Sequence, residues 1–113
     1  MTPLAKKTYD LLKKVPPGRV TTYKILADAL GTRGYRAIGQ ILRTNPYAPI
    51  IPCHRVIASD GTIGGFMGNT KGSAIKTKIK LLQQEGVRVS GERILNFEKV
   101  LFRFRPADLD KLS

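Results

Sequence analysis

The sequence contains one cysteine, one histidine and no tryptophan among its 113 residues. A single cysteine excludes an internal disulfide. One cysteine and one histidine cannot supply the four ligands of a structural zinc site without recruiting carboxylates, so we expect no metal. No apolar run approaches the roughly 18 residues that cross a bilayer, and residues 1–15 lack a secretory apolar core. We therefore expect a soluble, intracellular protein that does not contact membranes.

Acidic residues are also scarce. Eight Asp and Glu stand against twenty Lys and Arg, which gives a formal net charge of +12 and a pI near 10.3. Such a charge favours polyanions through counterion release and long-range steering. There are two alternatives: the excess of positive charge only keeps the protein soluble, or it serves contact with acidic lipid. Because the chain has no membrane-seeking amphipathic helix, nucleic acid is the leading partner.

A chain of this length predicts one domain spanning residues 1–113. Thr2 followed by Pro3 is typical of a helix start, Thr21 or Thr22 is expected to cap a second helix, and Gly31 ends that helix. Residues 19–21 suit a short extended piece. Apolar residues recur at helical spacing over 3–15, 22–30, 35–44 and 73–85.

The remaining segments contain glycine or alternate in polarity. Five glycines make residues 59–73 a flexible loop that lacks the spacing of a phosphate-binding loop, so we expect no nucleotide cofactor. Val87, Val89 and then residues 94–104 predict a small hairpin similar to a wing, because apolar residues alternate at period two over 100–104. Together these patterns predict a mostly helical α+β fold, a winged helix-turn-helix-like domain with a short C-terminal hairpin.

The helices expected over 22–30 and 35–44 are separated by a glycine-bounded turn, as in a helix-turn-helix whose second member faces nucleic acid. A helical hairpin of an ordinary core has the same pattern. Gly39 lies inside the second of these helices, where glycine costs roughly 1 kcal/mol relative to alanine. This position therefore predicts the close approach of another backbone.

The sequence Pro52-Cys53-His54-Arg55 places the lone cysteine beside the lone histidine. The thiolate is the reactive form of cysteine, and imidazole is the side chain best able to take its proton near neutral pH. A buried cysteine that only fills space is the alternative. The apolar residues on both sides and the turn at 59–61 indicate a short, rigid segment, so we interpret Cys53 as a nucleophile with a lowered thiol pKa.

Four motifs occur in order: Val20-Thr21-Thr22-Tyr23, Arg36-Ala37-Ile38-Gly39, Asn45-Pro46 and Ile51-Pro52-Cys53-His54-Arg55-Val56. Over about residues 4–90 the chain resembles the DNA-binding, active-site domain of O6-alkylguanine-DNA alkyltransferases (methylated-DNA–protein-cysteine methyltransferases). The resemblance implies repair of duplex DNA by a monomer without cofactor, in which the O6-alkyl group of a flipped guanine passes to Cys53 and the alkylated protein is spent. It further implies that His54, through a water, couples the thiol to Glu85.

The same resemblance implies roles for other residues. Asn45 would hold the active-site turn together, unless it is a plain cap before Pro46. Arg36 would fill the gap left by the flipped base, unless it is only a solvated charge. Tyr23 would rotate the adjacent phosphate, unless it is only a core aromatic residue. The further expected DNA contacts are Ala37, Gly39, Arg43 and Arg55, and the expected base pocket contains Phe66 and Met67.

The chain departs from the family in several respects. We expect no N-terminal accessory domain, Phe66 stands where a tyrosine is usual, and the loop over 67–73 is longer. Alkyltransferase-like proteins, which recognise O6-alkylguanine without chemistry, share the small size and a tail similar to residues 85–91, but they typically replace the cysteine. Cys53 therefore favours the enzyme over that binding module. A plain helix-turn-helix regulator would not explain the Cys-His adjacency. For an enzyme acting on DNA we expect a cytoplasmic or nucleoid-associated protein.

Overall fold

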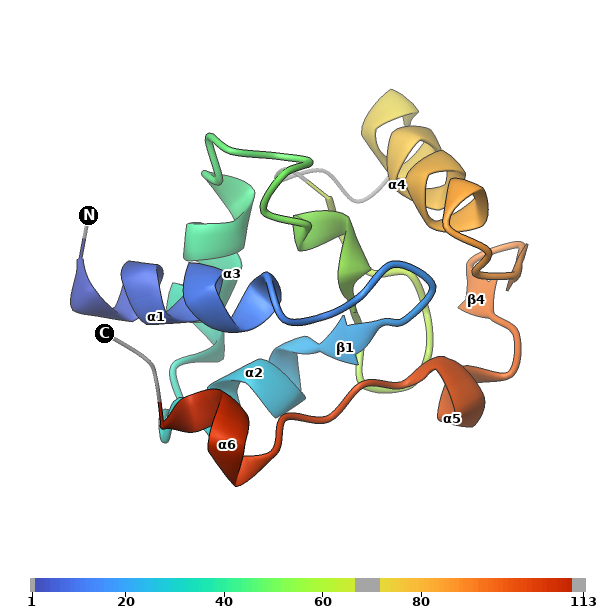
Figure 1. Ribbon diagram of the computed structural model, residues 1–113. Helices are drawn as coiled ribbons and strands as arrows, with labels where there is room; N and C mark the ends of the chain where they lie inside the picture. The colour runs from blue at the N-terminus through green and yellow to red at the C-terminus, as the bar shows by residue number, and fades with distance from the viewer. Residues whose placement is uncertain (1, 67–71, 111–113) are drawn as a thin grey trace.

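The computed structural model describes residues 2–66 and 72–110. Helices α1 (Pro3–Leu12), α2 (Tyr23–Ala29) and α3 (Tyr35–Arg43) pack together towards one end of the molecule (Figure 1). Helix α4 (Ser73–Gln84) lies at the other end. The 3-10 turn η1 (Cys53–Arg55) connects the two halves and contacts α4. The lone cysteine and histidine therefore lie at the centre of the fold.

Threonine side chains start the first two helices. The Thr2 hydroxyl accepts from the Ala5 amide at 3.1 Å, and the Thr22 hydroxyl accepts from the Ile25 amide at 3.0 Å. Each such cap contributes about 1 kcal/mol. Gly31 follows α2 with φ +68°, a left-handed conformation that favours glycine. The helices predicted over 22–30, 35–44 and 73–85 are confirmed to within a residue at each end, and α1 ends three residues earlier than predicted.

Two short strand pairs complete the fold. Strand β1 (Thr21–Thr22) pairs in parallel with β2 (Val56–Ile57), with Thr21 opposite Val56. Strand β3 (Val89–Ser90) pairs antiparallel with β4 (Arg93–Ile94). Because β1 directly precedes α2 and β2 directly follows η1, the first pair joins the helix-turn-helix to the Cys53 turn. The short extended piece predicted near residues 19–21 is thus confirmed.

The predicted C-terminal hairpin is shorter than expected. It ends at Ile94, and Asn96 in the left-handed region (φ 54°) leads into α5 (Phe97–Val100). The chain then runs past Val20, whose amide donates to the Val100 carbonyl at 2.9 Å, and reaches α6 (Pro106–Leu109). The strand predicted over 94–104 is therefore wrong. Its alternation arises because the Phe102 and Phe104 rings pack against the core while Arg103 is exposed.

The hairpin also lies beside α4, at the end of the molecule away from α1 and α3 (Figure 1). The mostly helical α+β class with small sheets is confirmed. None of the helices in the described part of the chain is both long and apolar enough to cross a membrane.

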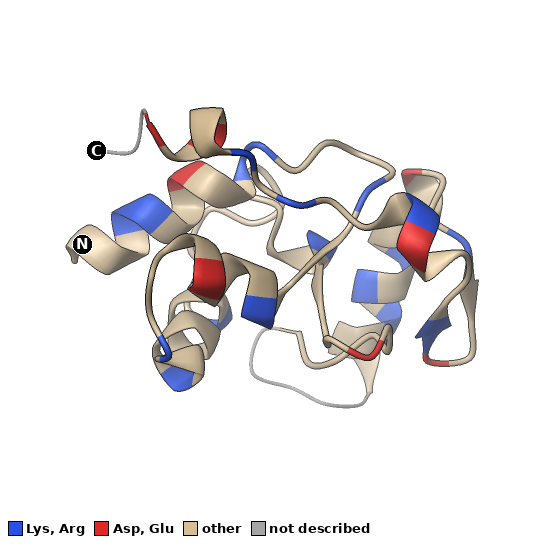
Figure 2. Ribbon diagram, turned by 90° about the horizontal axis from the view of Figure 1, so that it is seen from below, with Lys and Arg blue, Asp and Glu red and all other residues tan. Residues whose placement is uncertain are grey.

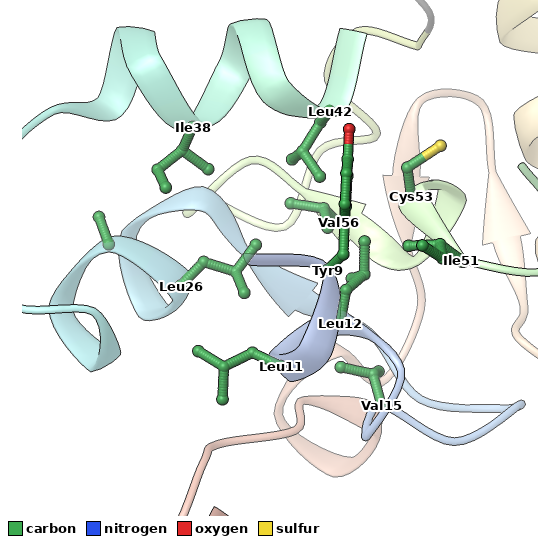
Figure 3. Packing of buried hydrophobic residues seen from close by; sticks show 11 residues of the cluster. Tyr9, Leu11, Leu12, Val15, Leu26, Ile38, Leu42, Ile51, Cys53 and Val56 are labelled. Atoms are coloured by element: carbon green, nitrogen blue, oxygen red, sulfur yellow. The ribbon is translucent and has the colours of Figure 1, made fainter. Parts of the chain in front are cut away.

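Two apolar clusters stabilise the two halves. The first fills the space between α1, α2, α3 and the Cys53 turn, and Figure 3 shows Cys53 at its edge with the sulfur turned away from it. The second joins β2 to α4 and the hairpin, and Phe66 packs against both clusters. Replacing a fully buried leucine such as Leu11 or Leu82 by alanine would cost about 2–5 kcal/mol. The Cys53 turn is thus held between two packed bodies.

Basic residues occur in each of the helices α1 to α5, whereas acidic residues are few (Figure 2). The excess positive charge is therefore distributed over the molecule. Exposed cations lie on α1, α3, α4 and the C-terminal segment.

Candidate active site

Cys53 begins the 3-10 turn and is almost enclosed. Its amide donates to the Ile51 carbonyl at 2.8 Å, and the Arg55 amide donates to the Pro52 carbonyl at 3.0 Å. Cys53 is 5% exposed and His54 is 2% exposed. Because Val56 continues directly into the parallel pair, the turn has little freedom to move.

Asn45 holds the loop that leads to Cys53. Its side-chain amide donates to the Ile51 carbonyl at 2.8 Å, and its side-chain oxygen accepts from the Tyr47 amide at 2.9 Å. The Asn45 side chain is buried, so both groups are paired inside the protein. The bond to Tyr47 is one that a plain turn before Pro46 would also make, whereas the bond to Ile51 connects this turn to the residues just before Cys53. The role of Asn45 in the active-site turn stays a prediction.

His54 and Glu85 form a direct pair across the fold. The imidazole Nε2 lies 3.1 Å from Glu85 Oε2 at the end of α4, and Glu85 remains 18% exposed. Since a carboxylate only accepts hydrogen bonds, Nε2 carries the proton and Nδ1 keeps a lone pair. Nδ1 is buried and makes no hydrogen bond within the described residues. This nitrogen is thus able to accept a proton.

Arg55 lies in the interior instead of on the DNA surface where we expected it. Its Nε and Nη2 donate to the Glu85 carboxylate at 2.9 and 2.5 Å, and its Nη1 donates to the Val15 carbonyl at 2.7 Å. Its side chain is only 12% exposed. Every guanidinium nitrogen is used within the protein, so Arg55 orients Glu85 and connects it to Val15 in the turn that follows α1.

The protonation states suit a thiol beside a neutral base. Burial raises the pKa of Cys53, and a hydrogen bond from Asn45 together with the positive charge of Lys78 offsets only part of that effect. The predicted lowering of the thiol pKa is therefore wrong: desolvation outweighs the neighbouring donors. Burial also lowers the pKa of His54, although Glu85 opposes the shift. At neutral pH the resting pair is a thiol and a neutral imidazole.

The pKa of Glu85 moves in the direction that supports this arrangement. Burial alone would raise it, but hydrogen bonds from Arg55 and His54 hold the pKa below its ordinary value. Glu85 is thus a carboxylate at neutral pH and stabilises an imidazolium if His54 takes a proton.

Lys78 is a buried feature of α4 that the sequence did not predict. It is fully buried, and its ammonium donates to the carbonyls of Val56 at 2.7 Å, Ile63 at 2.5 Å and Gly65 at 2.9 Å. Burial lowers its pKa to about 7. The available signal was its spacing: Lys78 lies on the same helical stripe as Ile75 and Leu82. It attaches the segment before Phe66 to the strand after Cys53.

The expected DNA-binding residues lie mostly at the surface of the helix-turn-helix. Arg36, Ala37 and Arg43 are exposed on α3, and Tyr23 at the start of α2 is half-buried. Burial and, to a smaller extent, the charge of Cys53 raise the Tyr23 pKa. The close approach predicted at Gly39 is wrong for the folded chain, since a Cβ built there meets nothing within 4 Å.

Of the two residues expected in the base pocket, the structure describes Phe66 but not Met67. Phe66 is half-buried between the two apolar clusters and presents no hydroxyl. Met67 lies outside the described residues.

The fold and the site define a helix-turn-helix domain with a buried cysteine beside a His–Glu pair. Residues 3–87 match the family described as 6-O-methylguanine DNA methyltransferase, DNA binding domain, and the chain belongs to that family.

Two relatives are methylated-DNA–protein-cysteine methyltransferases. That of Candida glabrata is 43% identical over 93 residues, 81% of this chain and 42% of the relative. That of Saccharolobus islandicus is 45% identical over 94 residues, 77% of this chain and 58% of the relative. The chain thus spans about half the length of these curated relatives.

Two solved structures are similar in shape. S. pombe Atl1, crystallised with damaged DNA containing O6-carboxymethylguanine, is 29% identical with a TM-score of 0.78, over 91% of this chain and 97% of that one. The O6-methylguanine-DNA methyltransferase of Pyrococcus kodakaraensis is 46% identical with a TM-score of 0.67, over 77% of this chain and 48% of that one. The chain is therefore similar both to methyltransferases and to a damage-binding protein.

Proposed function

We propose that this protein repairs DNA by transferring the alkyl group of O6-alkylguanine to Cys53, in a single turnover. The observation that carries the proposal is the buried thiol adjacent to a neutral imidazole whose other nitrogen is bound to a carboxylate. A cysteine that only fills space would not need that pair.

The reaction balances with the residues present. His54 Nδ1 takes the thiol proton, through a water as the family resemblance implies, and Glu85 stabilises the resulting imidazolium. The Cys53 sulfur forms a bond to the alkyl carbon, and the bond from that carbon to guanine O6 breaks. The electron pair of that bond remains on the guanine, which takes up the proton that the His54 imidazolium releases through the water, so His54 returns to its neutral form. Because the product thioether is not a nucleophile, the protein reacts once.

The helix-turn-helix supplies the surface for duplex DNA. Arg36 on α3 is exposed and would enter the gap left by a flipped base, while Tyr23, half-buried at the start of α2, would rotate the adjacent phosphate. Ala37 and Gly39 add no large side chain between the exposed Arg36 and Arg43, so the helix backbone can approach the groove at these two positions. Arg43 at the end of α3 adds a phosphate contact. We expect a monomer on DNA, in the compartment that contains the genome.

The base pocket is expected to be weaker than in relatives with a tyrosine at the position of Phe66. The Phe66 ring retains a packing surface but offers no hydroxyl donor to the base. Lys78 fixes the backbone that leads to this ring.

The alternative function is damage recognition without chemistry. It is favoured by the similarity to S. pombe Atl1 over nearly the whole of both chains. The presence of Cys53 and of its His54–Glu85 pair favours alkyl transfer instead.

Intact mass after incubation with a duplex containing O6-methylguanine distinguishes the two. Alkyl transfer adds one methyl group at Cys53 and adds none in Cys53→Ser or with an undamaged duplex. An unchanged mass, combined with tighter binding of the damaged duplex than of the undamaged one, would show recognition alone. An unchanged mass without preferential binding would remove both functions.

A further inference from the structure

A surface groove separates α1 from the loop that leads to Cys53. It has a volume of about 350 Å³, which lies at the lower end of the range of about 300–1,000 Å³ typical of ligand pockets. Its lining comprises Lys6, Tyr9, Asp10 and Lys13 from one face of α1, and Tyr47, Ile50 and Ile51 from the loop.

The groove contains apolar side chains that are exposed to water, which does not stabilise a free monomer. Ile50 is 85% exposed and Tyr47 is 47% exposed, although Ile51 of the same loop is buried. They are two of the four large apolar side chains that are exposed in the described part of the chain. Exposed apolar side chains that share one concave site are typical of interaction surfaces.

The groove is preformed. The Tyr9 and Tyr47 rings meet edge to face at 6.2 Å, and the Tyr9 hydroxyl donates to the Ile41 carbonyl at 2.9 Å. The Ile51 amide donates to the Tyr47 carbonyl at 2.9 Å. A partner therefore meets a rigid surface and loses little free energy in ordering it.

The charges around the groove select the class of partner. Lys6 and Lys13 are both exposed and stand two helical turns apart, roughly 10 Å along α1. Asp10 lies between them in the groove wall, so a continuous run of phosphates would meet a carboxylate there. Arg36 and Arg43 lie on the side of α3 opposite Ile38 and Leu42, which face the core and α1. The groove is thus separate from the expected DNA-binding face.

We propose that this groove binds a peptide segment of a partner protein, whose aromatic or aliphatic side chain packs on Tyr9, Tyr47 and Ile50 and whose flanking carboxylates pair with Lys6 and Lys13. An amphipathic helix is the form of peptide that most often fills such a groove. The proposal does not depend on alkyl transfer, because none of its residues takes part in that reaction.

The test is selection of random peptides displayed on phage against the full chain. The expected consensus contains acidic residues flanking an aromatic or aliphatic residue. By fluorescence anisotropy, the selected peptide is expected to bind Ile50→Ser and Lys6→Glu/Lys13→Glu each about tenfold or more weakly than the original chain. The matched charge reversal on α4, Lys76→Glu/Lys80→Glu, should leave binding unchanged, because both lysines are exposed away from the groove.

Three results would overturn the proposal: no enriched consensus, equal loss of binding in the α4 reversal, or undiminished binding to Ile50→Ser. Binding of a single-stranded oligonucleotide that depends on Ile50 would assign the groove to nucleic acid instead. The groove variants should retain alkyl transfer, so failure of the catalytic proposal would be seen separately, in the mass assay.

Discussion

Replacing Glu85 by glutamine tests whether the His54–Glu85–Arg55 cluster serves catalysis as well as folding. Glu85 accepts hydrogen bonds from His54 and Arg55, and its side chain is 18% exposed. Glutamine keeps one oxygen acceptor, but its NH2 group would face one of the donors on His54 or Arg55. It also leaves the positive charge of Arg55 without a carboxylate. Breaking one side of a mostly buried pair costs about 3–5 kcal/mol, and the retained acceptor places the expected loss near 3 kcal/mol. The melting temperature should fall by about 10–20 °C.

The same substitution should slow alkyl transfer about a hundredfold, because the imidazolium that forms at His54 loses its carboxylate. Single-turnover transfer from an O6-methylguanine duplex, well below the melting temperature, measures this rate, and circular dichroism measures the melting. Glu92→Gln, at an exposed position of the hairpin, is the matched control. Arg55→Met should destabilise to a similar extent but slow transfer less, because it leaves the His54–Glu85 bond. A wild-type rate in Glu85→Gln would refute the reasoning and make the pair purely structural.

Three further results are expected. The free energy of unfolding should rise between about pH 7 and pH 8.5, by at most about 1.4 kcal/mol per pH unit. In this range Lys78 of the unfolded chain still binds a proton, whereas folded Lys78, with its pKa at about 7, has released it. Urea titrations at several pH values measure this slope, which should be smaller in Lys78→Met. The transfer rate should fall on acidification with an apparent pKa below 6.5, because the His54 pKa is lowered, and a midpoint above 6.5 would contradict the neutral-base assignment. Arg36→Ala should slow transfer from duplex DNA about tenfold while leaving transfer from the free base unchanged, whereas Arg88→Ala on the hairpin should affect neither.

The helices were predictable because their caps and apolar stripes are local. Thr2, Thr22 and Gly31 lie where hydrogen-bond and backbone requirements place helix ends, and the pattern over 35–43 is short but regular. The parallel pairing of Thr21 with Val56 was not predictable, because partners so distant in the chain leave no periodic signal. The period-two pattern over 100–104 correctly set Phe102 and Phe104 inward and Arg103 outward. Leu101, which the alternation sets on the outward side, is instead buried and bridges to Val20.

The candidate site was predictable in part for the same reason. The Cys53–His54 adjacency is read directly from the chain, and the family resemblance supplied Glu85 and Asn45. The interior position of Arg55 depends on three acceptors that converge only on folding. The raised pKa of Cys53 depends on burial, which no motif expresses. Lys78 was missed because a lysine on an apolar stripe is usually assigned to solvent.

The ladder between β1 and β2 acts as a fixed spacer within the molecule. It connects the start of α2 to the residue after the Cys53 turn through backbone groups, so the reach from the helix-turn-helix to the sulfur does not depend on any one side chain. If the chain binds DNA as proposed, side-chain changes on α3 should therefore alter which duplexes are bound without altering the distance from the helix-turn-helix to the sulfur. Inserting a single residue between Thr22 and Tyr23 would change it, since α2 would be displaced relative to β1 and hence relative to the sulfur. A designer who wished to redirect this protein would accordingly vary the surface of α3 and leave the length of the chain from Val20 to Tyr23 unchanged.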